Sequence, residues 1–370
     1  MRNEYSVLLG KMLIMKNKYD LAIVRVDRIG DYVLWHDTLS AYKKKYAGKK
    51  VLLICPSALT TIVREESFFF DIITYDHQKA KKSHGYLIKL FFQMRSISSE
   101  EVIYPSWRRS VLGDIIVSGI RSRHKIGMQG VPDVEHSCTA YINRFFNSFY
   151  SQLVENPDTS NEINAIEYFT RKIVSEDYCY GTHKLESSTP NPVCLKKYAV
   201  VAFSAYNKFR IWSMEKFVQL IDHIPLDYEV VLSGYGAEDE ERADFIIANI
   251  KEKKRIVNMV GKTTIPQLIS LIDDAVFVIG NDSSAIHIAA ATQTPSLCIL
   301  PGAHYGRFVP YPDDITTIKY KPKSVFYKMD CYGCNYSCTR PITDSYECLR
   351  QITVDMAVKE LDSLLKELGD

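Results

Sequence analysis

The sequence predicts an α/β fold built from two successive units, each with a parallel sheet that helices cover on both faces. Short apolar runs rich in β-branched residues alternate with amphipathic stretches, as parallel strands and their crossover helices do. The alternation is interrupted between residues 147 and 196, where Asn156-Pro157 and Asn191-Pro192 indicate loops, and it then starts again. A chain of 370 residues has room for two domains of ordinary size. With 46% hydrophobic and 24% charged residues, the composition excludes a disordered, collagen-like or small disulfide-bonded protein.

The first unit begins with the apolar run 21–26 (LAIVRV), which ends at a turn that contains Gly30. An amphipathic stretch, 32–46, follows this turn, so the region predicts a strand, a glycine turn and a helix. The next buried run, 51–55, is ended by Pro56. The remaining expected elements are helices at 58–66, 86–96 and 161–175 and strands at 71–75 and 101–104.

The second unit begins with the apolar run 198–203 (YAVVAF). Its other expected elements are strands at 229–233, 256–258, 275–279 and 296–300 and helices at 213–223, 237–250, 265–273 and 285–291. Apolar residues at helical spacing predict a last helix over 353–368. We therefore expect an N-terminal domain at 1–190, a C-terminal domain at 191–350 and a C-terminal helix within 351–370.

Charge is unevenly distributed along the chain. The formal net charge is only +2, so no nucleic-acid partner is expected. Residues 1–150 nevertheless contain 23 Lys and Arg against 14 Asp and Glu, whereas residues 151–370 contain 23 against 30. The basic N-terminal part predicts an acidic partner for that part, or else a merely solvated basic face.

The sequence also bears on the compartment. It contains no run of about 18 uninterrupted apolar residues that would predict a transmembrane helix. The N-terminal VLLGKMLIM is interrupted by Lys11 and lacks a small-residue cleavage site, so no secretory signal is expected. Nine cysteines is an odd number, and several are scattered through apolar or loop contexts, which favours a reduced cytoplasm.

Three turns that contain glycine follow predicted strands. They are Arg28-Ile29-Gly30-Asp31, Gly234-Tyr235-Gly236-Ala237 and Gly280-Asn281-Asp282-Ser283-Ser284, with His287 one helical turn further along. Ligands of open parallel sheets bind at the carboxyl ends of strands, and a helix N-terminus suits a phosphate. The second turn lacks the third glycine of a dinucleotide fingerprint, so it is weak evidence for a nicotinamide oxidoreductase and can equally be structural.

Taken one at a time, the polar residues of these turns have ordinary explanations. Asp31 and Asp282 can cap helices, and His287 can be a satisfied helix histidine. Arg210 in FRIW can be an exposed cation. A buried carboxylate that faces a cleft can instead act as a general base.

Three blocks of the sequence together resemble glycosyltransferase family 9, the lipopolysaccharide heptosyltransferases. They are LAIVRVDRIGDYVLWHDTLSAYKKKY at 21–46, FSAYNKFRIWSMEKFVQLI at 203–221 and NMVGKTTIPQLISLIDDAVFVIGNDSSAIHIAAATQTPSLCIL at 258–300. Their order and spacing match the family over about residues 20–360, and RIGD and GNDSxxxH are the most specific parts.

The resemblance implies a GT-B fold, in which two Rossmann-like domains face each other across a cleft. It implies an inverting transfer of a sugar from a nucleotide diphosphate donor, with the acceptor on the N-terminal domain, the donor on the C-terminal domain and no cofactor required. By the match to RIGD, Asp31 is expected to be the general base, and Arg210 is expected to contact the donor phosphates as the catalytic cation. The other expected donor-binding residues are Arg28, Gly30, Ser204, Lys208, Gly234, Asp239, Thr263, Asp282, Ser283, Ser284 and His287. Ser284 departs from the usual glycine of the family.

The expected reaction transfers a heptose from ADP-heptose to a lipopolysaccharide core or a related cell-envelope glycan. The open alternatives are another donor sugar, a protein acceptor, or a silent protein that only binds a nucleotide sugar. The basic stretch 107–125 resembles acceptor-binding stretches of the family, or else is a solvated helix face. It predicts contacts of an anionic lipid-linked glycan with Arg108, Arg109, Arg121 and Arg123. Peripheral contact with the inner face of the bacterial inner membrane is a further expectation.

Four cysteines gather near the C-terminus, at Cys331, Cys334, Cys338 and Cys348. Four thiolates in 18 residues have the ligand count of a structural zinc or iron site. Disulfides formed on isolation and a reduced structural knuckle are the alternatives.

Overall fold

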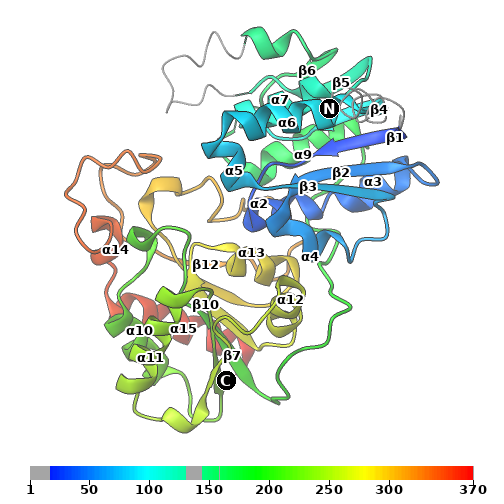
Figure 1. Cartoon of the computed structure of the whole chain (residues 1–370). Coiled ribbons are helices and arrows are strands. Elements are labelled where there is room, and N and C mark those ends of the chain that lie inside the picture. The colour runs from blue at the N-terminus through cyan, green and yellow to red at the C-terminus, as the bar shows by residue number, and fades with distance from the viewer. Residues whose placement is uncertain (1–16, 131–143, 158, 370) are drawn as a thin grey trace, which may run out of the picture. The chain divides into compact units, whose positions relative to one another are not determined.

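The computed structural model describes residues 17–130, 144–157 and 159–369, so the N-terminal VLLGKMLIM lies outside the described residues. It divides into two compact units. Unit 1 comprises the described residues up to Tyr32, Thr38–Thr159 and Asn164–Tyr178, and unit 2 comprises Val33–Asp37, Ser160–Ile163 and the described residues from Cys179 onward. Each unit contains one six-stranded sheet with flanking helices, which confirms the predicted α/β class (Figure 1). The expected boundary at residue 190 falls inside unit 2, as does the C-terminal helix.

The sheet of unit 1 is parallel throughout, in the order β3-β2-β1-β4-β5-β6. Its strands are β1 (Asn17–Val24), β2 (Val51–Pro56), β3 (Asp71–Tyr75), β4 (Ile97–Tyr104), β5 (His124–Met128) and β6 (Gln152–Val154). The helices of this part of the chain are α2 (Ile29–His36), α3 (Leu39–Lys45), α4 (Thr60–Val63), α5 (His77–Lys82), α6 (His84–Arg95), α7 (Val111–Gly119) and α9 (Glu162–Ile173). Strand β2 is buried along its whole length because its residues are apolar on both faces.

The sheet of unit 2 is also parallel throughout, in the order β12-β11-β10-β7-β8-β9. Its strands are β7 (Tyr198–Ala202), β8 (Glu229–Ser233), β9 (Ile256–Asn258), β10 (Phe277–Asn281), β11 (Ser296–Ile299) and β12 (Lys323–Val325). Its helices are α10 (Met214–His223), α11 (Ala237–Asn249), α12 (Ile265–Asp273), α13 (Ser284–Ala291), α14 (Glu347–Arg350) and α15 (Val354–Leu368). Helix α15 packs on α10, β11 and β12, so its apolar face completes the core of unit 2.

The two sheets have the same topology. In each, the first strand lies in the middle, with the second strand on one side and the fourth on the other. The strand order therefore reverses between β1 and β4 in unit 1 and between β7 and β10 in unit 2. Open α/β sheets bind ligands at the carboxyl ends of the strands beside such a reversal. The topology therefore predicts a ligand position in each unit, at the carboxyl ends of β1 and β4 in unit 1 and of β7 and β10 in unit 2.

The structure differs from the predicted elements in several places. The helix expected over 32–46 is two helices, α2 and α3, because the chain turns at Asp37. The Asp37 carboxylate accepts a hydrogen bond from the backbone N–H of His183, 3.1 Å away. Six of the named helices and strands were not predicted, namely α5, α7, α14, β5, β6 and β12. No helix in the described part of the chain is long and apolar enough to cross a membrane.

Candidate functional site

Asp31 lies where the strand order of unit 1 reverses, in the first turn of α2 just after β1. One of its carboxylate oxygens, Oδ2, accepts a long 3.4 Å hydrogen bond from the backbone N–H of Arg28. The side chain is partly exposed, whereas that of Arg28 is exposed. A carboxylate in the first turn of a helix is held by the free N–H groups there. The RIGD turn therefore presents an accessible carboxylate at the carboxyl ends of the strands beside the reversal.

Arg25, which the sequence motifs did not single out, joins this turn to the neighbouring strand. Its guanidinium is buried and donates through Nη1 to the carbonyl of Pro105, just beyond β4, at 2.9 Å. Its Nη2 lies 2.5 Å from Oδ2 of Asp27 and 3.4 Å from the carbonyl oxygen of Asp31. Arg25 therefore ties together the ends of β1 and β4, which are the two strands beside the reversal.

The four arginines of the basic stretch do not lie together. Arg108 is exposed just beyond β4, on the same edge of the sheet as Asp31, with its guanidinium carbon 5.1 Å from the ring centre of Trp107. Arg121 and Arg123 lie immediately before β5, at the amino-terminal ends of the strands and so opposite Asp31. The backbone N–H of Arg121 donates to the carbonyl of Ile97, where β4 begins. Strand β4 has eight residues. At ~3.3 Å per residue, its amino and carboxyl ends, and the arginines beside them, lie roughly 25 Å apart.

Arg109 has a structural environment. Its guanidinium forms a buried pair with Asp114, with 3.0 Å between Nε and Oδ1, and also donates to the carbonyl of Met128 and to Oδ1 of Asn147. The hydroxyl of Tyr150 donates to the same Asp114 oxygen at 2.6 Å. Burial raises the pKa of Asp114, and the Arg109 charge opposes that rise. This network engages the charge of Arg109, whereas Arg108 is exposed at the same end of the strands as Asp31.

In unit 2, Arg210 and Asp282 meet where the strand order reverses. Arg210 ends a short 3-10 turn after β7, and Asp282 follows β10. The Arg210 Nη2 atom lies 2.7 Å from Oδ2 of Asp282 and 3.0 Å from its carbonyl oxygen. Burial is the largest single influence on the pKa of Arg210 and lowers it, but Asp282, Tyr336 and Cys298 together raise the pKa above its ordinary value, so the guanidinium stays charged.

Asn281 positions this pair. Its side chain is 0% exposed; its Oδ1 accepts from the backbone N–H of Trp212 at 3.1 Å, and its Nδ2 donates to the carbonyl of Phe203. Both ends of the Arg210 loop are thereby fixed to the end of β10. Gly280 permits the close strand contact, because a Cβ there would lie 2.8 Å from the carbonyl oxygen of Ala202.

Two buried polar atoms beside this pair lack a partner. Within the described part of the chain, neither Nε of Arg210 nor the hydroxyl of Tyr336 makes a hydrogen bond. The two residues are in contact, since the guanidinium carbon of Arg210 lies 5.0 Å from the ring centre of Tyr336. Tyr336 also has a φ of 62°, which is unusual for a bulky side chain. Buried unsatisfied donors commonly mark a ligand position.

The remaining residues expected to bind the donor fall into two groups. Ser204, Lys208, Ser283 and Ser284 lie beyond β7 or β10, close in sequence to the Arg210–Asp282 pair, and Ser283 is the N-cap of α13. The second group follows β8 and β9, further along the same carboxyl ends of the strands, and consists of Gly234, Asp239 and Thr263. Asp239 is buried, and its carboxylate already has partners within unit 2. It accepts a hydrogen bond from the backbone N–H of Tyr235 and forms an ion pair with Arg242 at 2.7 Å. Gly236 has a φ of 93° at the start of α11, so this turn has a structural reason for its glycine.

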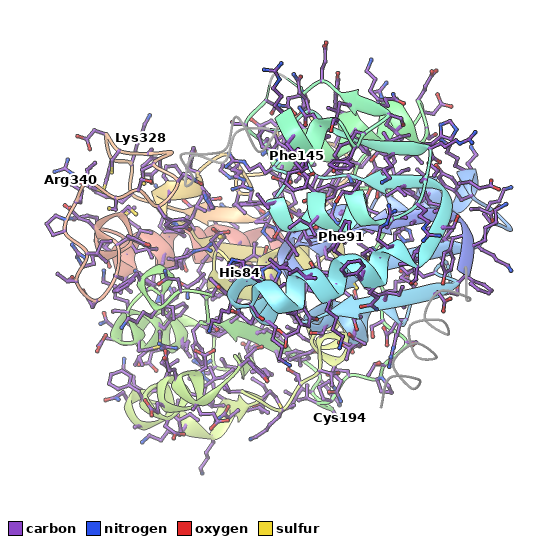
Figure 2. All side chains as sticks on the ribbon, turned by 45° about the horizontal axis from the view of Figure 1, so that its top comes forward. His84, Phe91, Phe145, Cys194, Lys328 and Arg340 are labelled. Carbon is purple, nitrogen blue, oxygen red and sulfur yellow. The ribbon has the colours of Figure 1, made fainter. Side chains whose placement is uncertain are left out.

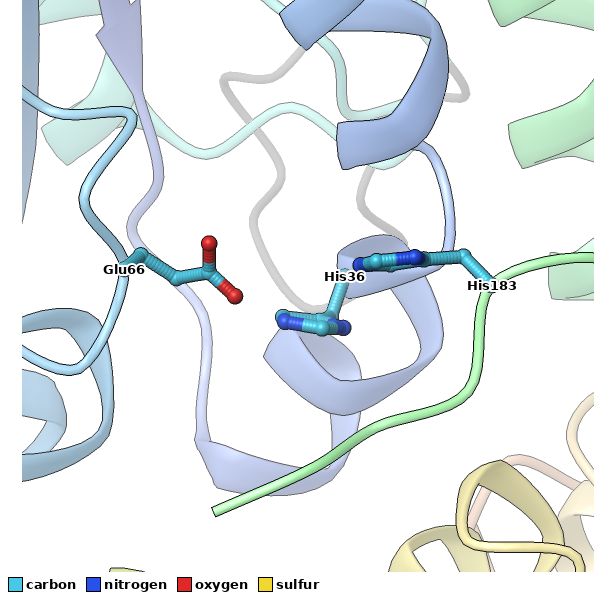
Figure 3. A group of neighbouring side chains, drawn as sticks. All are labelled: His36, Glu66 and His183. Carbon is cyan, nitrogen blue, oxygen red and sulfur yellow. The ribbon is translucent and has the colours of Figure 1, made fainter. Parts of the chain in front are cut away.

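His287 is buried on α13 and contacts Tyr311. Its Nδ1 lies 3.0 Å from the Tyr311 hydroxyl, and the two rings are stacked. Both side chains line a small pocket of unit 2, which His36 and His183 also line. The rings of His36 and His183 stack with their centres 5.1 Å apart (Figure 3).

The four C-terminal cysteines line another small pocket of unit 2, together with Tyr336 and Tyr346. Within the described residues, none of the four forms a disulfide. Burial raises the pKa of Cys334 and Cys348, and the neighbouring thiols contribute to both shifts. Among the described residues, however, no three of these sulfurs all lie within 4.8 Å of one another. The donor set suits zinc or iron, but the sulfurs are not assembled around one point.

Two characterised relatives are similar in sequence. The chain is 24% identical to lipopolysaccharide heptosyltransferase 3 of Escherichia coli over 277 residues, which are 73% of this chain and 80% of the relative. It is 37% identical to lipopolysaccharide heptosyltransferase 3 of Escherichia coli strain K12 over 120 residues, or 32% of this chain. That second alignment spans only 35% of the relative's length.

Solved structures share the fold. The family 9 glycosyltransferase of Veillonella parvula gives a TM-score of 0.71 at 15% identity and covers 95% of this chain and 99% of its own. The E. coli heptosyltransferase WaaC with ADP gives a TM-score of 0.64 at 14% identity, covering 94% and 98%. The dodecameric iron-containing heptosyltransferase TibC, in complex with ADP-D-beta-D-heptose, gives 0.53 at 14% identity, covering 96% and 78%. At these identities the likeness establishes the two-domain α/β fold of the GT-B glycosyltransferases.

The family model for glycosyltransferase family 9 matches residues 115–332. This range is more than half of the chain and includes Arg210, Asp282 and His287, whereas Asp31 lies outside it. The match includes two of the three motif blocks, 203–221 and 258–300, and agrees with the sheet topology. The chain therefore belongs to glycosyltransferase family 9, the heptosyltransferase family.

Proposed function

We propose that this chain is a cytoplasmic, inverting glycosyltransferase that moves a heptose from ADP-heptose to a lipopolysaccharide core or a related anionic, lipid-linked glycan. The observation that carries the proposal is the Arg210–Asp282 pair at the strand reversal of unit 2. Beside it, Nε of Arg210 and the Tyr336 hydroxyl have no hydrogen-bond partner among the described residues. The donor is suggested by WaaC and TibC, whose structures contain ADP and ADP-D-beta-D-heptose.

In the proposed reaction, Arg210 and the N-terminus of α13 hold the donor diphosphate. The bond between the anomeric carbon and the diphosphate oxygen breaks, and the leaving group takes the electron pair. Its growing negative charge is then stabilised by a fixed guanidinium and by the free N–H groups of a helix N-terminus. Nε of Arg210 and the Tyr336 hydroxyl are two further donors for the diphosphate oxygens, which would remove their unsatisfied state.

On the acceptor side, Asp31 takes the proton of the attacking hydroxyl. The freed oxygen forms the new bond to the anomeric carbon from the face opposite the leaving group, so the configuration inverts. A carboxylate suits this role because it is a proton acceptor at neutral pH and can be tuned by its surroundings. Arg108, exposed on the same edge of unit 1, is proposed to attract anionic groups of the acceptor.

Binding of a nucleotide sugar tests the proposal directly. Unfolding temperatures should be measured with ADP-heptose, ADP, other nucleotide sugars and NAD. A ligand at about 100 times its dissociation constant stabilises the folded state by ~2.7 kcal/mol, and we expect this from ADP-heptose and none from NAD. Stabilisation without turnover on any glycan acceptor would indicate a silent binding protein, and stabilisation by NAD alone would contradict the proposal.

We also propose that the four-cysteine pocket binds a structural zinc or iron ion, which supports the loop that carries Tyr336. The support is the shared pocket, the four unpaired thiols and the likeness to the iron-containing TibC. Elemental analysis of protein purified without chelator should find about one metal per chain. Cys334→Ser should lower both metal content and unfolding temperature, because metal binding is coupled to folding.

The control for this experiment is Cys194→Ser, which removes an exposed thiol outside the pocket. A metal-free preparation whose four thiols titrate freely and whose unfolding temperature matches that of the metal-supplemented protein would rule out the metal.

A further inference from the structure

A second arginine of unit 2, Arg307, has a buried hydrogen-bond donor without a partner. Arg307 lies in the loop after β11, the strand next to β10, and so at the same carboxyl ends of the strands as the Arg210–Asp282 pair. In the described part of the chain its Nε atom makes no hydrogen bond, as is also true of Nε of Arg210. Buried donors of this kind are rare in native proteins and need an explanation. A bound anion that accepts hydrogen bonds would satisfy both arginines.

Packing and an ion pair hold the Arg307 side chain in place. Its guanidinium carbon lies 4.4 Å from the ring centre of Phe308, and its backbone N–H donates to the carbonyl of His304 at 2.9 Å. Its Nη2 atom lies 3.5 Å from Oε2 of Glu162, a residue that also belongs to unit 2. Charge-assisted hydrogen bonds between nitrogen and oxygen are ~2.7–2.9 Å long, so the contact with Glu162 is loose. The guanidinium is therefore fixed in position without being fully engaged.

Aromatic rings connect Arg307 to Arg210. The centre of the His304 ring lies 5.5 Å from that of Phe308 and 4.6 Å from that of Tyr336, and Tyr336 contacts the Arg210 guanidinium. The pKa of His304 is lowered to about 4, first by burial and then by the positive charge of Arg307, with a smaller lowering by Arg210. Both guanidinium groups therefore act on the same neutral imidazole.

The two arginines lie on opposite sides of the end of β10. Arg210 follows β7 and Arg307 follows β11, and β10 lies between these two strands in the sheet. A diphosphate at the end of β10 would therefore have one guanidinium on each side. The donor-binding residues expected after β8 and β9 lie on the Arg210 side. This order places the nucleoside on that side and the phosphate that bears the sugar nearer to Arg307.

We infer that Arg307 is a second cation of the donor site and binds the phosphate that bears the sugar. The assignment rests on the proposed function and adds a residue to it. The Nε–H of Arg307 donates to an oxygen of that phosphate, which satisfies the buried donor, while Phe308 supports the plane of the guanidinium. This phosphate carries the oxygen that leaves the anomeric carbon, so its negative charge grows as that bond breaks. A fixed guanidinium beside it therefore stabilises both the bound donor and the leaving group.

Calorimetric titration with ADP and with AMP tests the inference, because AMP lacks the second phosphate. Arg307→Ala should weaken ADP binding by roughly 10-fold or more, the loss expected for a hydrogen bond to a charged group, and leave AMP binding nearly unchanged. Arg307→Lys keeps the charge but not the planar fork, and should recover part of the loss. Failure of the wild type to bind ADP would contradict the proposed function itself. Equal ADP binding by the wild type and Arg307→Ala would overturn only the role of Arg307.

Glu162→Gln distinguishes phosphate binding from a structural ion pair. If Arg307 served only to pair with Glu162, loss of either partner would weaken ADP binding alike. If Arg307 binds the phosphate, Glu162→Gln removes a competing carboxylate, and ADP affinity should be retained or increased. Unfolding temperatures that match the wild type would show that each variant is folded.

The control for nearby positive charge is Lys328→Ala. Lys328 is an exposed cation on the loop that carries Tyr336, and its side chain points outward (Figure 2). This variant should bind ADP like the wild type. Equal losses of ADP affinity in Arg307→Ala and Glu162→Gln, or in Arg307→Ala and Lys328→Ala, would each overturn the inference. An equal loss of AMP and ADP affinity in Arg307→Ala would do so as well.

Discussion

Asp31→Asn should reduce turnover by ~100-fold or more while leaving the dissociation constant for ADP nearly unchanged. The amide keeps the size of the side chain and can still accept the hydrogen bond from the Arg28 N–H, but it cannot take a proton from an acceptor hydroxyl. The loss should therefore appear in kcat. Initial rates of transfer at saturating donor measure it, together with calorimetric titration of ADP.

Two results would contradict the assignment of Asp31 as the base. Near-wild-type turnover of Asp31→Asn would mean that another group accepts the proton. A large loss of ADP affinity would mean that Asp31 acts on the donor instead. A wild-type unfolding temperature is the check that the turn at the end of β1 is intact.

Arg210→Ala should weaken ADP binding by roughly 10- to 150-fold and also lower turnover. A hydrogen bond to a charged group contributes ~1.5–3 kcal/mol, which corresponds to this range, and the charge on the leaving group grows further in the transition state. The variant also leaves the buried Asp282 without its cation, so its unfolding temperature must be compared with that of the wild type. Calorimetric titration of ADP measures the affinity directly.

Substitutions in unit 1 should distinguish binding of the acceptor from binding of the donor. Arg108→Ala should keep ADP affinity and raise the apparent Michaelis constant for an anionic acceptor, with an effect that shrinks as salt rises. Arg123 lies at the amino-terminal ends of the strands, away from Asp31. Arg123→Ala should therefore change neither the ADP affinity nor the apparent Michaelis constant for the acceptor. If Arg108→Ala lost ADP affinity while Arg210→Ala kept it, the donor would not bind where we propose.

Most strands could be predicted from sequence alone, including the edge strands β3 and β9, whereas β5, β6 and β12 could not. Strands β2 and β8 lie where the apolar runs 51–55 and 229–233 predicted them, because a strand buried on both faces must be apolar at successive positions. Strands β6 and β12 have three residues each and include Gln152 and Lys323, so they lack such a run. Helix α7 lies inside the basic stretch 107–125, whose flanking arginines indicate a binding surface and obscure the apolar helical segment between them.

Motifs located the candidate sites but not the residues that support them. The blocks RIGD and GNDS predicted the positions of Asp31 and Asp282, since each is a short segment after a strand. Asn281 and Tyr336 act through contacts with residues 69 to 126 positions away, and no local pattern reveals such contacts. Conversely, Arg108 and Arg123 are close in sequence, but the chain crosses the whole sheet between them.

Because the two units have the same strand order, each loop of one unit has an equivalent loop in the other. At two of these equivalent loops, the candidate site residues have opposite charges. After the first strand, unit 1 presents the acidic Asp31 and unit 2 the basic Arg210; after the fourth strand, unit 1 presents the basic Arg108 and unit 2 the acidic Asp282. The candidate site residues therefore carry opposite charges at equivalent loops of one architecture that occurs twice. The two proposed roles, proton acceptance at Asp31 and diphosphate binding at Arg210, are thus compatible with a single topology that differs in its loop residues.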